Sequence, residues 1–434
     1  MASVPPVMSA PGLWRDRDFR RLFAAQVASQ LGEQAGQVIL PLVAVVALDA
    51  GATRLGLLRA VEQAPILLLS LFAGAWVDHR RSRPVMMLAD LGRALALAAI
   101  PAAYLLGVLT IPLLLVVAFL VGALSVFSEV AYQTCLVRLV RRDQLVRGNG
   151  ALEGSRSAAR IGGPALGGAM VSLLSAPAAV AGSAFFFALS FLSLRRIRRR
   201  EPRPGHGGHA RIWRRIHEGL CLVAGDPSLR AVALASAAFQ FFFAALMTVY
   251  LLFLPRGLHL PGAAVGLVLA AMGPGAVAGS LLSARLPARF GYGRVMVSSA
   301  ALADAVMLCA PALRGSTAVT VVLLMAINFV FGACGQLVDV TVMSVRQAIV
   351  PVPMQGRVVA TINFAGMGPT PLGSLLGGCL AGWWGLRTGL LLTAAGLTLS
   401  PLFMALSPLA RLGRDLPAEP GPSGGPIRRP AGSR

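Results

Sequence analysis

Long apolar stretches separated by short polar breaks run along most of this chain. From Leu22 to Met404, stretches of about 20 mostly apolar residues recur, the length that an α-helix needs to cross a bilayer. Closed β-barrels show alternating segments of about 10 residues instead of long continuous runs, so the pattern predicts membrane-spanning helices. We place twelve spans at residues 22–48, 55–77, 85–107, 112–136, 150–174, 177–194, 229–254, 262–284, 294–313, 317–341, 358–382 and 387–407.

A weak internal repeat divides these spans into two sets of six. RLVRRDQLVRGN, before the fifth span, matches RQAIVPVPMQGR, before the eleventh, at an offset of about 208 residues. GGPALGG and GPTPLGSLLGG follow at nearly the same offset. Secondary transporters are built from such repeats and bind substrate between them, near the middle of the bilayer. The predicted fold class is therefore an all-α polytopic membrane protein with two pseudo-symmetric six-helix bundles.

The predicted domain boundaries follow from this division. They are a cytoplasmic N-terminal segment at 1–21, bundles at 22–194 and 229–407, a basic cytoplasmic linker at 195–228 and a cytoplasmic tail at 408–434. The linker contains RRIRRREPRPGHGGH, whose charge favours contact with anionic membrane lipid. The tail is rich in Pro, Gly, Ser and Arg, and we expect it to be disordered because it has too little apolar content to pack.

Composition and charge support a membrane protein with a defined orientation. The chain is 56 % hydrophobic and only 13 % charged, which excludes an ordinary soluble domain. The net charge of +22 comes from arginines in the breaks between spans, so the positive-inside rule explains it better than nucleic-acid binding. Opposite-side breaks carry only Arg54, Arg256, Arg314 and Arg387. We expect a multi-pass protein of the cell membrane with both termini cytoplasmic.

The chemistry of an enzyme is missing from the motifs. The sequence contains no GxSxG, HExxH or Walker motif, and its scattered cysteines form no CxxC and have no histidine at ligand spacing. We therefore expect no enzymatic activity, no cofactor and no metal site. Cys135, Cys221, Cys309, Cys334 and Cys379 are interpreted as small packing residues.

The break after the second span combines an acid with a basic cluster. It reads Gly74-Ala-Trp-Val-Asp78, followed by His79, two arginines, Ser82 and Arg83. An acid at a helix end and nearby arginines supply charges that can pair across a closing seam. The pattern resembles the signature between helices two and three of the major facilitator superfamily, although His79, Arg81 and Ser82 depart from it. The resemblance implies a cytoplasmic gate formed by Gly74, Asp78, Arg81 and Arg83.

The fifth span carries a second resemblance. Gly163, Pro164, Gly167 and Gly168 resemble the Gly-Pro signature of the superfamily's exporters and antiporters, although small residues also serve generic close packing. LRAVEQAP, ADLGRAL, FSEVAYQ, RRDQLVRGN and HEGLCLVAGDPSLRA resemble the macrolide-efflux-like and transmembrane-secretion-effector-like branch. The resemblance runs from Phe19 to about Leu406 and implies a major facilitator fold, export and a functional monomer.

Ionisable side chains inside spans are costly and are therefore functional candidates. In the fold that the resemblance implies, helices one, four, seven and ten line a central cavity, which places Glu33 and Glu129 there. A partly desolvated carboxylate binds a proton more readily than one in water, so we hypothesise that Glu33 carries a coupling proton, tuned by Arg160 or Glu62. The alternative is a permanent ion pair, such as Glu129 with Arg93 or Glu33 with Arg160. The cavity and proton candidates are Glu33, Glu62, Glu129, Arg160 and Asp339, and the ion-pair candidates are Asp90, Arg93, Arg156 and Asp304.

The seventh and tenth spans supply candidates for an apolar substrate pocket. Phe243 and Met247 suit a pocket for bulky drug-like molecules, although lipid or helix packing is the better explanation for most such residues of this span. Gln240 and Asn328 are polar groups in apolar stretches, and they are either helix-to-helix hydrogen bonds or substrate contacts.

Together these features predict a secondary active transporter. The interpretation is proton-coupled efflux of a small, largely hydrophobic molecule, such as a drug or natural product, by alternating access. Uptake or facilitated diffusion of a small metabolite is the alternative within transport. A non-transporting scaffold or a membrane enzyme is disfavoured, because two repeated halves with Gly/Pro-interrupted helices are typical of alternating access.

Overall fold

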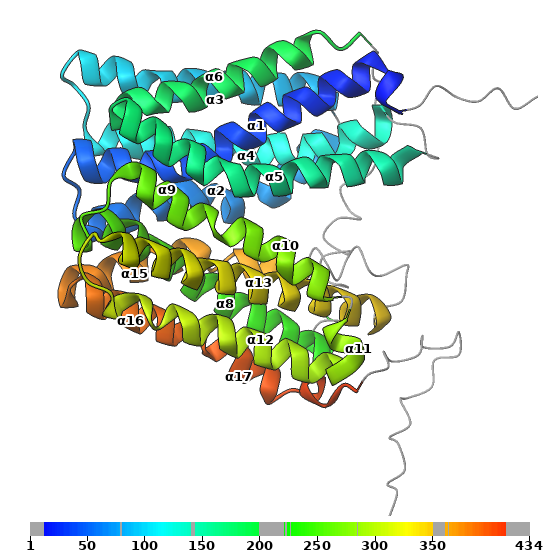
Figure 1. Ribbon diagram of the computed structural model, residues 1–434. Coiled ribbons are helices and arrows are strands. Elements are labelled where there is room, and N and C mark those ends of the chain that lie inside the picture. The colour runs from blue at the N-terminus through cyan, green and yellow to red at the C-terminus, as the bar shows by residue number, and fades with distance from the viewer. Residues whose placement is uncertain are drawn as a thin grey trace, which may run out of the picture.

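Figure 1 shows the computed structural model, which describes residues 13–78, 80–139, 144–198, 221, 224–225, 227–283, 285–349, 361–362 and 364–413. The helices of the N-terminal half are η1 (Leu13–Arg15), α1 (Arg17–Leu42), η2 (Val43–Ala47), α2 (Ala52–Asp78), α3 (Ser82–Leu105), α4 (Ile111–Leu139), α5 (Leu145–Leu173) and α6 (Ala176–Arg195). Those of the C-terminal half are α8 (Pro227–Leu252), η4 (Phe253–Gly257), α9 (Gly262–Ala270), α10 (Met272–Ser283), α11 (Leu286–Phe290), α12 (Tyr292–Met307), η5 (Ala310–Ala312), α13 (Ala318–Ile349), α15 (Thr370–Trp384), α16 (Leu386–Leu397), α17 (Leu399–Ala405) and η7 (Pro408–Arg411).

These helices confirm the predicted fold class. The described residues form no β-strand, and their helices correspond to the twelve predicted spans. Nine helical segments in the described part of the chain are long and apolar enough to cross a membrane on their own. The spans outside that set are α2, α5 and α15. Each packs against a helix of the other half, α2 against α15 and α5 against α9, and we call this boundary between the halves the seam. The predicted linker and tail lie largely outside the described residues, although η7 packs on α12 at the start of the tail.

Prolines explain two interruptions that the span prediction missed. The eighth span is split into α9 and α10, and the twelfth into α16 and α17. A proline has no N–H to donate to the carbonyl four residues earlier. For Pro274 that carbonyl belongs to Ala270, the last residue of α9, and for Pro401 it belongs to Leu397, the last residue of α16.

The first helix of each half ends in the same unusual way. The segments η2 and η4 are π-helical turns of five residues each, and each is followed by a non-glycine residue with positive φ, Asp49 at 48° and His259 at 57°. Ala50 N–H donates to the Ala44 carbonyl at 2.8 Å, and Leu260 N–H donates to the Leu254 carbonyl at 3.1 Å. The two ends repeat at a constant offset, so the internal repeat extends to backbone detail.

The two halves lie side by side and meet closely at one end (Figure 1). We call the end with residues 13 and 413 the terminal end, and the other the opposite end. Near the opposite end α5 crosses α9 through Gly168 and Gly266. A Cβ on Gly266 would lie 2.6 Å from the Pro164 carbonyl oxygen, so only glycine fits there. Arg256 of η4 also forms an ion pair with Asp49 of the N-terminal half and donates to the Val45 carbonyl at 3.2 Å.

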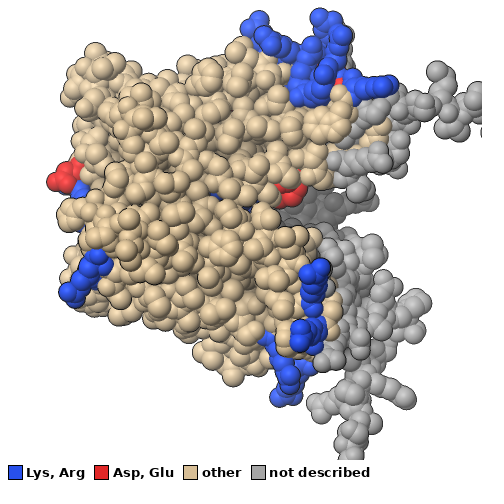
Figure 2. Space-filling view, in the orientation of Figure 1, with Lys and Arg blue, Asp and Glu red and all other residues tan. Residues whose placement is uncertain are grey.

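On the face drawn in Figure 2, the charged side chains of the described residues gather at the two ends and along the seam. Figure 2 shows a broad tan surface with arginines gathered at its two ends, as expected when the middle faces lipid. It also shows acidic atoms in the hollow between the halves towards the terminal end. The tight contacts at the opposite end and this hollow indicate that the seam opens towards the terminal end.

Candidate functional site

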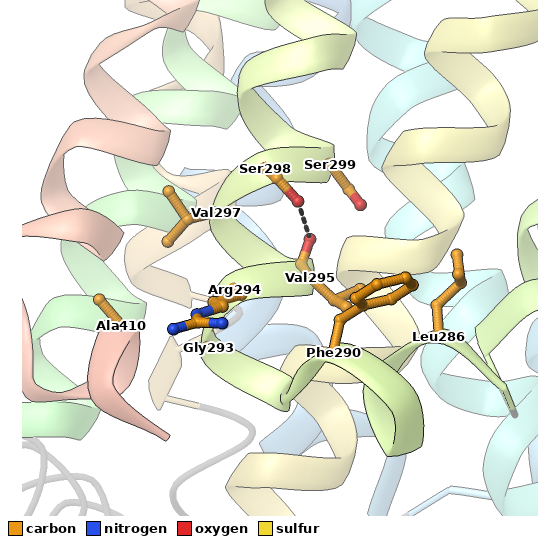
Figure 3. Close-up of a pocket in the computed structure, with 9 residues that line it drawn as sticks. All are labelled: Leu286, Phe290, Gly293, Arg294, Val295, Val297, Ser298, Ser299 and Ala410. Atoms are coloured by element: carbon orange, nitrogen blue, oxygen red, sulfur yellow. Dashed lines mark hydrogen bonds between the residues drawn. The ribbon is translucent and has the colours of Figure 1, made fainter. Parts of the chain in front are cut away.

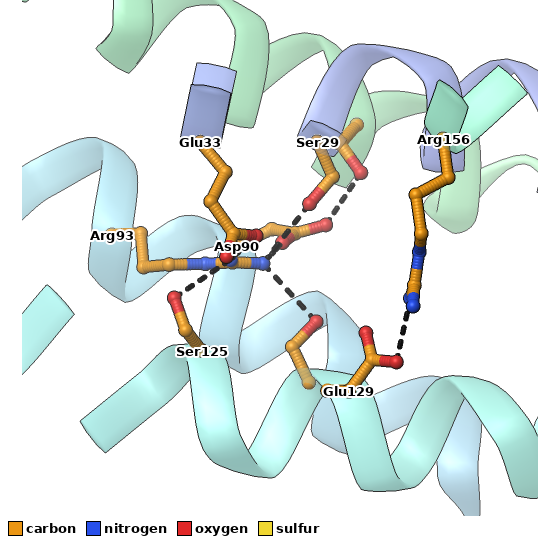
Figure 4. A network of polar contacts seen from close by, with 9 residues as sticks. Ser29, Glu33, Asp90, Arg93, Ser125, Glu129 and Arg156 are labelled. Carbon is orange, nitrogen blue, oxygen red and sulfur yellow. Dashed lines mark hydrogen bonds and ion pairs between the residues drawn. The ribbon is translucent and has the colours of Figure 1, made fainter. Parts of the chain in front are cut away.

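A buried arginine organises the polar network of the N-terminal half. The guanidinium of Arg93, on α3, is 1 % exposed, and it donates to hydroxyls from two other helices and to Asp90 one turn away on its own helix (Figure 4). Its carbon lies 4.3 Å from the centre of the Phe187 ring. Asp90, equally buried, also accepts from the Ser190 hydroxyl of α6 at 2.5 Å. The hydroxyls that accept from Arg93 are those of Ser29, Ser125 and Ser128, each at 3.1 Å.

Glu33 is the second carboxylate beside this arginine. It lies one turn from Ser29 on α1, and its Oε2 is 3.8 Å from a terminal nitrogen of Arg93, farther than a hydrogen bond. Its side chain is 35 % exposed, whereas that of Asp90 is 2 % exposed. Arg93 therefore has one permanent, buried partner in Asp90 and one looser, accessible partner in Glu33.

A second ion pair lies next to Glu33. Arg156 of α5 donates to Glu129 of α4 at 2.6 Å, and both side chains are partly exposed (Figure 4). The charges of Arg93, Glu129, Arg156 and Glu62 all act on Glu33. One turn along α5, Arg160 is exposed, as is Asp339 of α13 in the other half, and the described residues form no ion pair between them.

These contacts correct the predicted pairings. The alternative to a proton carrier named Glu129 with Arg93 or Glu33 with Arg160 as examples of an ion pair, but Glu129 pairs with Arg156, and Arg93 pairs with Asp90 and approaches Glu33. Arg160 forms no ion pair with the described residues. Arg156, one turn earlier on α5, meets α4 of its own half. Spacing along one helix cannot distinguish these partners.

Two other predicted ionisable residues have different surroundings. Glu62 pairs with Arg59 one turn away on α2, at 3.1 Å, with both side chains mostly buried. Asp304, on α12, is 1 % exposed and forms no ion pair with any residue that the structure describes, and its Oδ2 has no hydrogen-bond partner. Its prediction as an intramembrane ion-pair residue is therefore wrong within the described chain, because the helices packed around α12 bring no cation to it.

The predicted gate motif is only partly described. Gly74 and Asp78 lie in the last turns of α2, and their side-chain surroundings fall outside the described residues, as does His79. Arg81 is the exposed N-cap of α3. Arg83 donates to the carbonyls of Leu194 at 2.9 Å and Arg195 at 2.8 Å, and it thus satisfies the free carbonyls at the end of α6.

The Gly-Pro motif of α5 packs against both halves. On one side, a Cβ on Gly167 would lie 2.8 Å from the Ala35 carbonyl oxygen of α1, and Gly163 lies beside Gln34. On the other side, Pro164 and Gly168 contact Gly266 of α9. These four small positions bring α5 close to its neighbours, which is the packing role considered from the sequence.

The pocket candidates of the C-terminal half divide into core and partly accessible residues. Asn328 is fully buried, and its amide donates to the Tyr250 hydroxyl at 2.7 Å. Of the two roles left open, a hydrogen bond between helices and a contact with substrate, the structure shows the first. Phe243 and Met247 are partly buried against the core, and Gln240 is half-buried. Phe243 stacks against Phe239 and Phe331, with ring centres 5.4 and 5.8 Å away, and those two rings also stack on each other at 6.4 Å.

Sequence reasoning missed the hydroxyls that complete the network. Ser29, Ser125, Ser128 and Ser190 bind Arg93 or Asp90, and none of them was named as a site residue, although Ser128 belongs to the segment FSEVAYQ. A signal was present in the spacing, because Ser29 precedes Glu33, and Ser125 precedes Glu129, by one helical turn in otherwise apolar spans. A serine one turn from an intramembrane acid is therefore a useful sign of a polar face.

Solved transporter structures share the overall fold of this chain. A bacterial homologue of the human lysosomal transporter Spinster, inward-facing and occupied, matches with a TM-score of 0.72, 13 % identity and coverage of 93 % of this chain and 98 % of that one. A bacterial homologue of the iron transporter ferroportin, in an inward-facing state, matches at 0.69, with 15 % identity and 91 and 98 % coverage. The nucleoside transporter NupG matches at 0.69, with 14 % identity and 89 and 98 % coverage. At these identities the likeness establishes the fold.

The twelve-helix fold and its neighbours define a membrane transporter of the major facilitator superfamily, not an enzyme. Within that superfamily the chain belongs to the transmembrane secretion effector family, whose model matches residues 9–420. The multidrug efflux pump Tap of Mycolicibacterium fortuitum is 28 % identical over 383 residues, which cover 82 % of this chain and 87 % of that protein.

Proposed function

We propose that the protein exports a small, largely hydrophobic molecule across the cell membrane in exchange for protons, and that Glu33 carries the proton. The observation that carries this proposal is the unequal pairing of Arg93. Asp90 neutralises the arginine permanently in the buried core, whereas Glu33 approaches it loosely and remains accessible from the seam. A carboxyl that gains and loses a proton needs access to a proton source and a nearby charge that changes its affinity, and Glu33 has both.

The neighbouring ion pairs suggest how proton and substrate are coupled. Glu129 and Arg156 lie beside Glu33 and are partly exposed, so a substrate entering the seam changes the electrostatics and hydration of all three groups. Protonation of Glu33 removes one of the two acids next to Arg93, which alters the balance of charge between the helices. This gives proton binding a differential effect on the two conformations of the seam, as coupling requires.

The substrate type follows from the opposite wall. Phe239 and Phe243 stack on the buried core residue Phe331 in the C-terminal half and are partly buried, as is Met247 nearby. Aromatic and methionine side chains favour bulky apolar molecules. The relative's name, a multidrug efflux pump, agrees with such a substrate and with export, and the related activity of drug resistance is part of this proposal.

The orientation proposed here places both termini in the cytoplasm. At the opposite end, the described arginines of the connections are Arg54, Arg256, Arg314 and Arg387, whereas many more lie at the terminal end. Under the positive-inside rule the terminal end is cytoplasmic. A seam that opens there corresponds to an inward-facing transporter, ready to take substrate from the cytoplasm, and we propose that it works as a monomer.

The proposal is tested with purified protein in liposomes that contain a pH-sensitive dye. An imposed proton gradient is combined with a lipophilic dye such as ethidium and with hydrophobic antibiotics, and substrate-triggered proton flux is recorded. We expect flux for the wild type, a loss of at least about 100-fold for Glu33→Gln, and unchanged binding of substrate, because glutamine keeps the shape without the titrating proton.

The matched control is Glu153→Gln, which removes an exposed carboxylate of α5 that does not contact Arg93. Wild-type flux in this control attributes the loss to Glu33. Undiminished gradient-driven transport in Glu33→Gln contradicts the assigned carrier. Substrate equilibration without any proton flux in the wild type contradicts proton coupling and indicates a facilitator.

A further inference from the structure

Two pockets lie at the terminal end, outside the seam, and they differ in charge. One, of about 650 Å³, lies along α12 and η7 and has mostly apolar walls, with Arg294 as its one arginine (Figure 3). The other, of about 520 Å³, lies between the start of α1 and the end of α6 and is strongly basic. Its lining consists of Arg17, Arg20, Arg21, Ala24, Ser193 and Arg196.

We propose that this basic α1/α6 pocket is a binding site for the headgroup of an anionic phospholipid. The residues from α1 recur at positions i, i+3, i+4 and i+7, so they form a single face of the helix. That face meets Ser193 and Arg196, one turn apart at the end of α6. Two helices therefore direct four guanidinium groups at one volume, and guanidinium groups bind phosphate through paired hydrogen bonds.

Most of this positive charge is not neutralised within the protein. Arg21 pairs with Asp18 at 3.0 Å, and Asp18 also accepts from the backbone N–H of Arg198 at 3.1 Å. Arg17, Arg20 and Arg196 are exposed and form no ion pair with the described residues. The free carbonyls at the end of α6, which would repel an anion, already accept hydrogen bonds from Arg83.

The surface below the pocket fits the rest of a phospholipid. Phe185, Leu189 and Leu192 are exposed on α6, and their spacing to Arg196 places all four on one face of the helix. Exposed Trp14 packs edge-on against Phe19 and Phe23 beside the first arginines of α1. Tryptophan at headgroup level and an apolar stripe below it are typical of a membrane interface. An acyl chain on the stripe puts its phosphate among the arginines, which a free phosphate ion would not require.

The test compares bound lipid in native mass spectra of the full-length protein, titrated with phosphatidylglycerol or phosphatidylcholine. The site variant is Arg17→Gln/Arg20→Gln/Arg196→Gln. The control variant, Arg230→Gln/Arg285→Gln/Arg411→Gln, removes three exposed arginines from the terminal end of the other half. We expect the wild type to prefer phosphatidylglycerol for its first lipid. The site variant is expected to lose on the order of 100-fold in that affinity, at about a factor of five for each arginine near an anionic headgroup.

The control variant should keep the wild-type affinity for the first phosphatidylglycerol, and both variants should elute as monodisperse protein with the wild-type melting temperature in lipid-free detergent. Equal loss in the two variants overturns the proposal, because general surface charge then explains the binding. Full retention by the site variant also overturns it. Inorganic phosphate at matched concentration is expected not to displace the lipid, and effective displacement would assign the pocket to a soluble phosphate compound instead.

Discussion

The two halves repeat the same backbone but use it for different chemistry. The N-terminal half buries Arg93 and Asp90 among serine hydroxyls and presents Glu33 and the pair of Glu129 and Arg156 next to them. The C-terminal half stacks three phenylalanines on one another, and the buried hydrogen bond between Asn328 and Tyr250 joins two neutral groups. The two halves thus share a backbone but differ in side chains. We call the group around Arg93, Asp90 and Glu33 the charged wall, and the stacked phenylalanines the apolar wall.

This difference is consistent with how a coupled transporter divides its tasks. A proton carrier needs partly desolvated charges that are held firmly, and a site for varied hydrophobic molecules needs adaptable apolar surface. Placing the two on opposite walls of one seam lets a single conformational change act on both. The halves are locked together at the opposite end by glycine contacts and by Arg256 with Asp49, so that change requires these contacts to separate.

The largest expected effect comes from breaking the charged wall. Arg93→Met leaves Asp90 buried without a cation, and we expect it to lower the free energy of unfolding by about 3–5 kcal/mol. Chemical unfolding in mixed micelles measures this. The double variant Arg93→Met/Asp90→Asn, which removes both charges, should recover much of the loss. A single variant as stable as the wild type contradicts the role of Arg93 as the organising charge.

A smaller effect is expected on the apolar wall. Phe243→Ala removes a ring that stacks against both Phe239 and Phe331, and we expect the KM for a hydrophobic substrate to rise about tenfold, equivalent to about 1.4 kcal/mol. Proton coupling should remain, because no charged group is altered. Phe185→Ala, on the exposed face of α6, is the matched control. If Phe243→Ala abolishes coupling but leaves KM unchanged, the assignment of tasks to the two walls is reversed.

The smallest effect concerns the contact that joins the halves. Arg256→Gln removes the ion pair with Asp49, whose side chain is 96 % exposed. Exposed pairs contribute less than about 1 kcal/mol, so we expect the melting temperature to remain close to that of the wild type and the transport rate to change no more than about twofold. Thermal unfolding and the liposome assay check both. A tenfold change in rate would indicate that this pair controls the opening of the seam.

Much of the fold was predictable because membrane-spanning helices depend on the hydropathy of neighbouring residues in the sequence. Runs of apolar residues located the spans, and the internal repeat divided them into two halves. The proline interruptions were missed although their cause is local: Pro274 and Pro401 end the helices four residues before them. The placement of Glu33 and Glu129 in a cavity stays a prediction, and the ion pairs named as examples of the alternative are not the ones that form.

The sequence by itself determined that this chain is a twelve-helix membrane protein with its charges at the ends and a few acids in the spans. Hydropathy and proline act within one helix, so their consequences can be derived without neighbours. Only the tertiary structure decided that Arg93 binds Asp90 and that Arg156 binds Glu129. Those partners depend on the rotation and tilt of whole helices. Close packing of glycines, such as Gly168 against Gly266, fixes that rotation and tilt, and the periodicity within a single span does not contain this information.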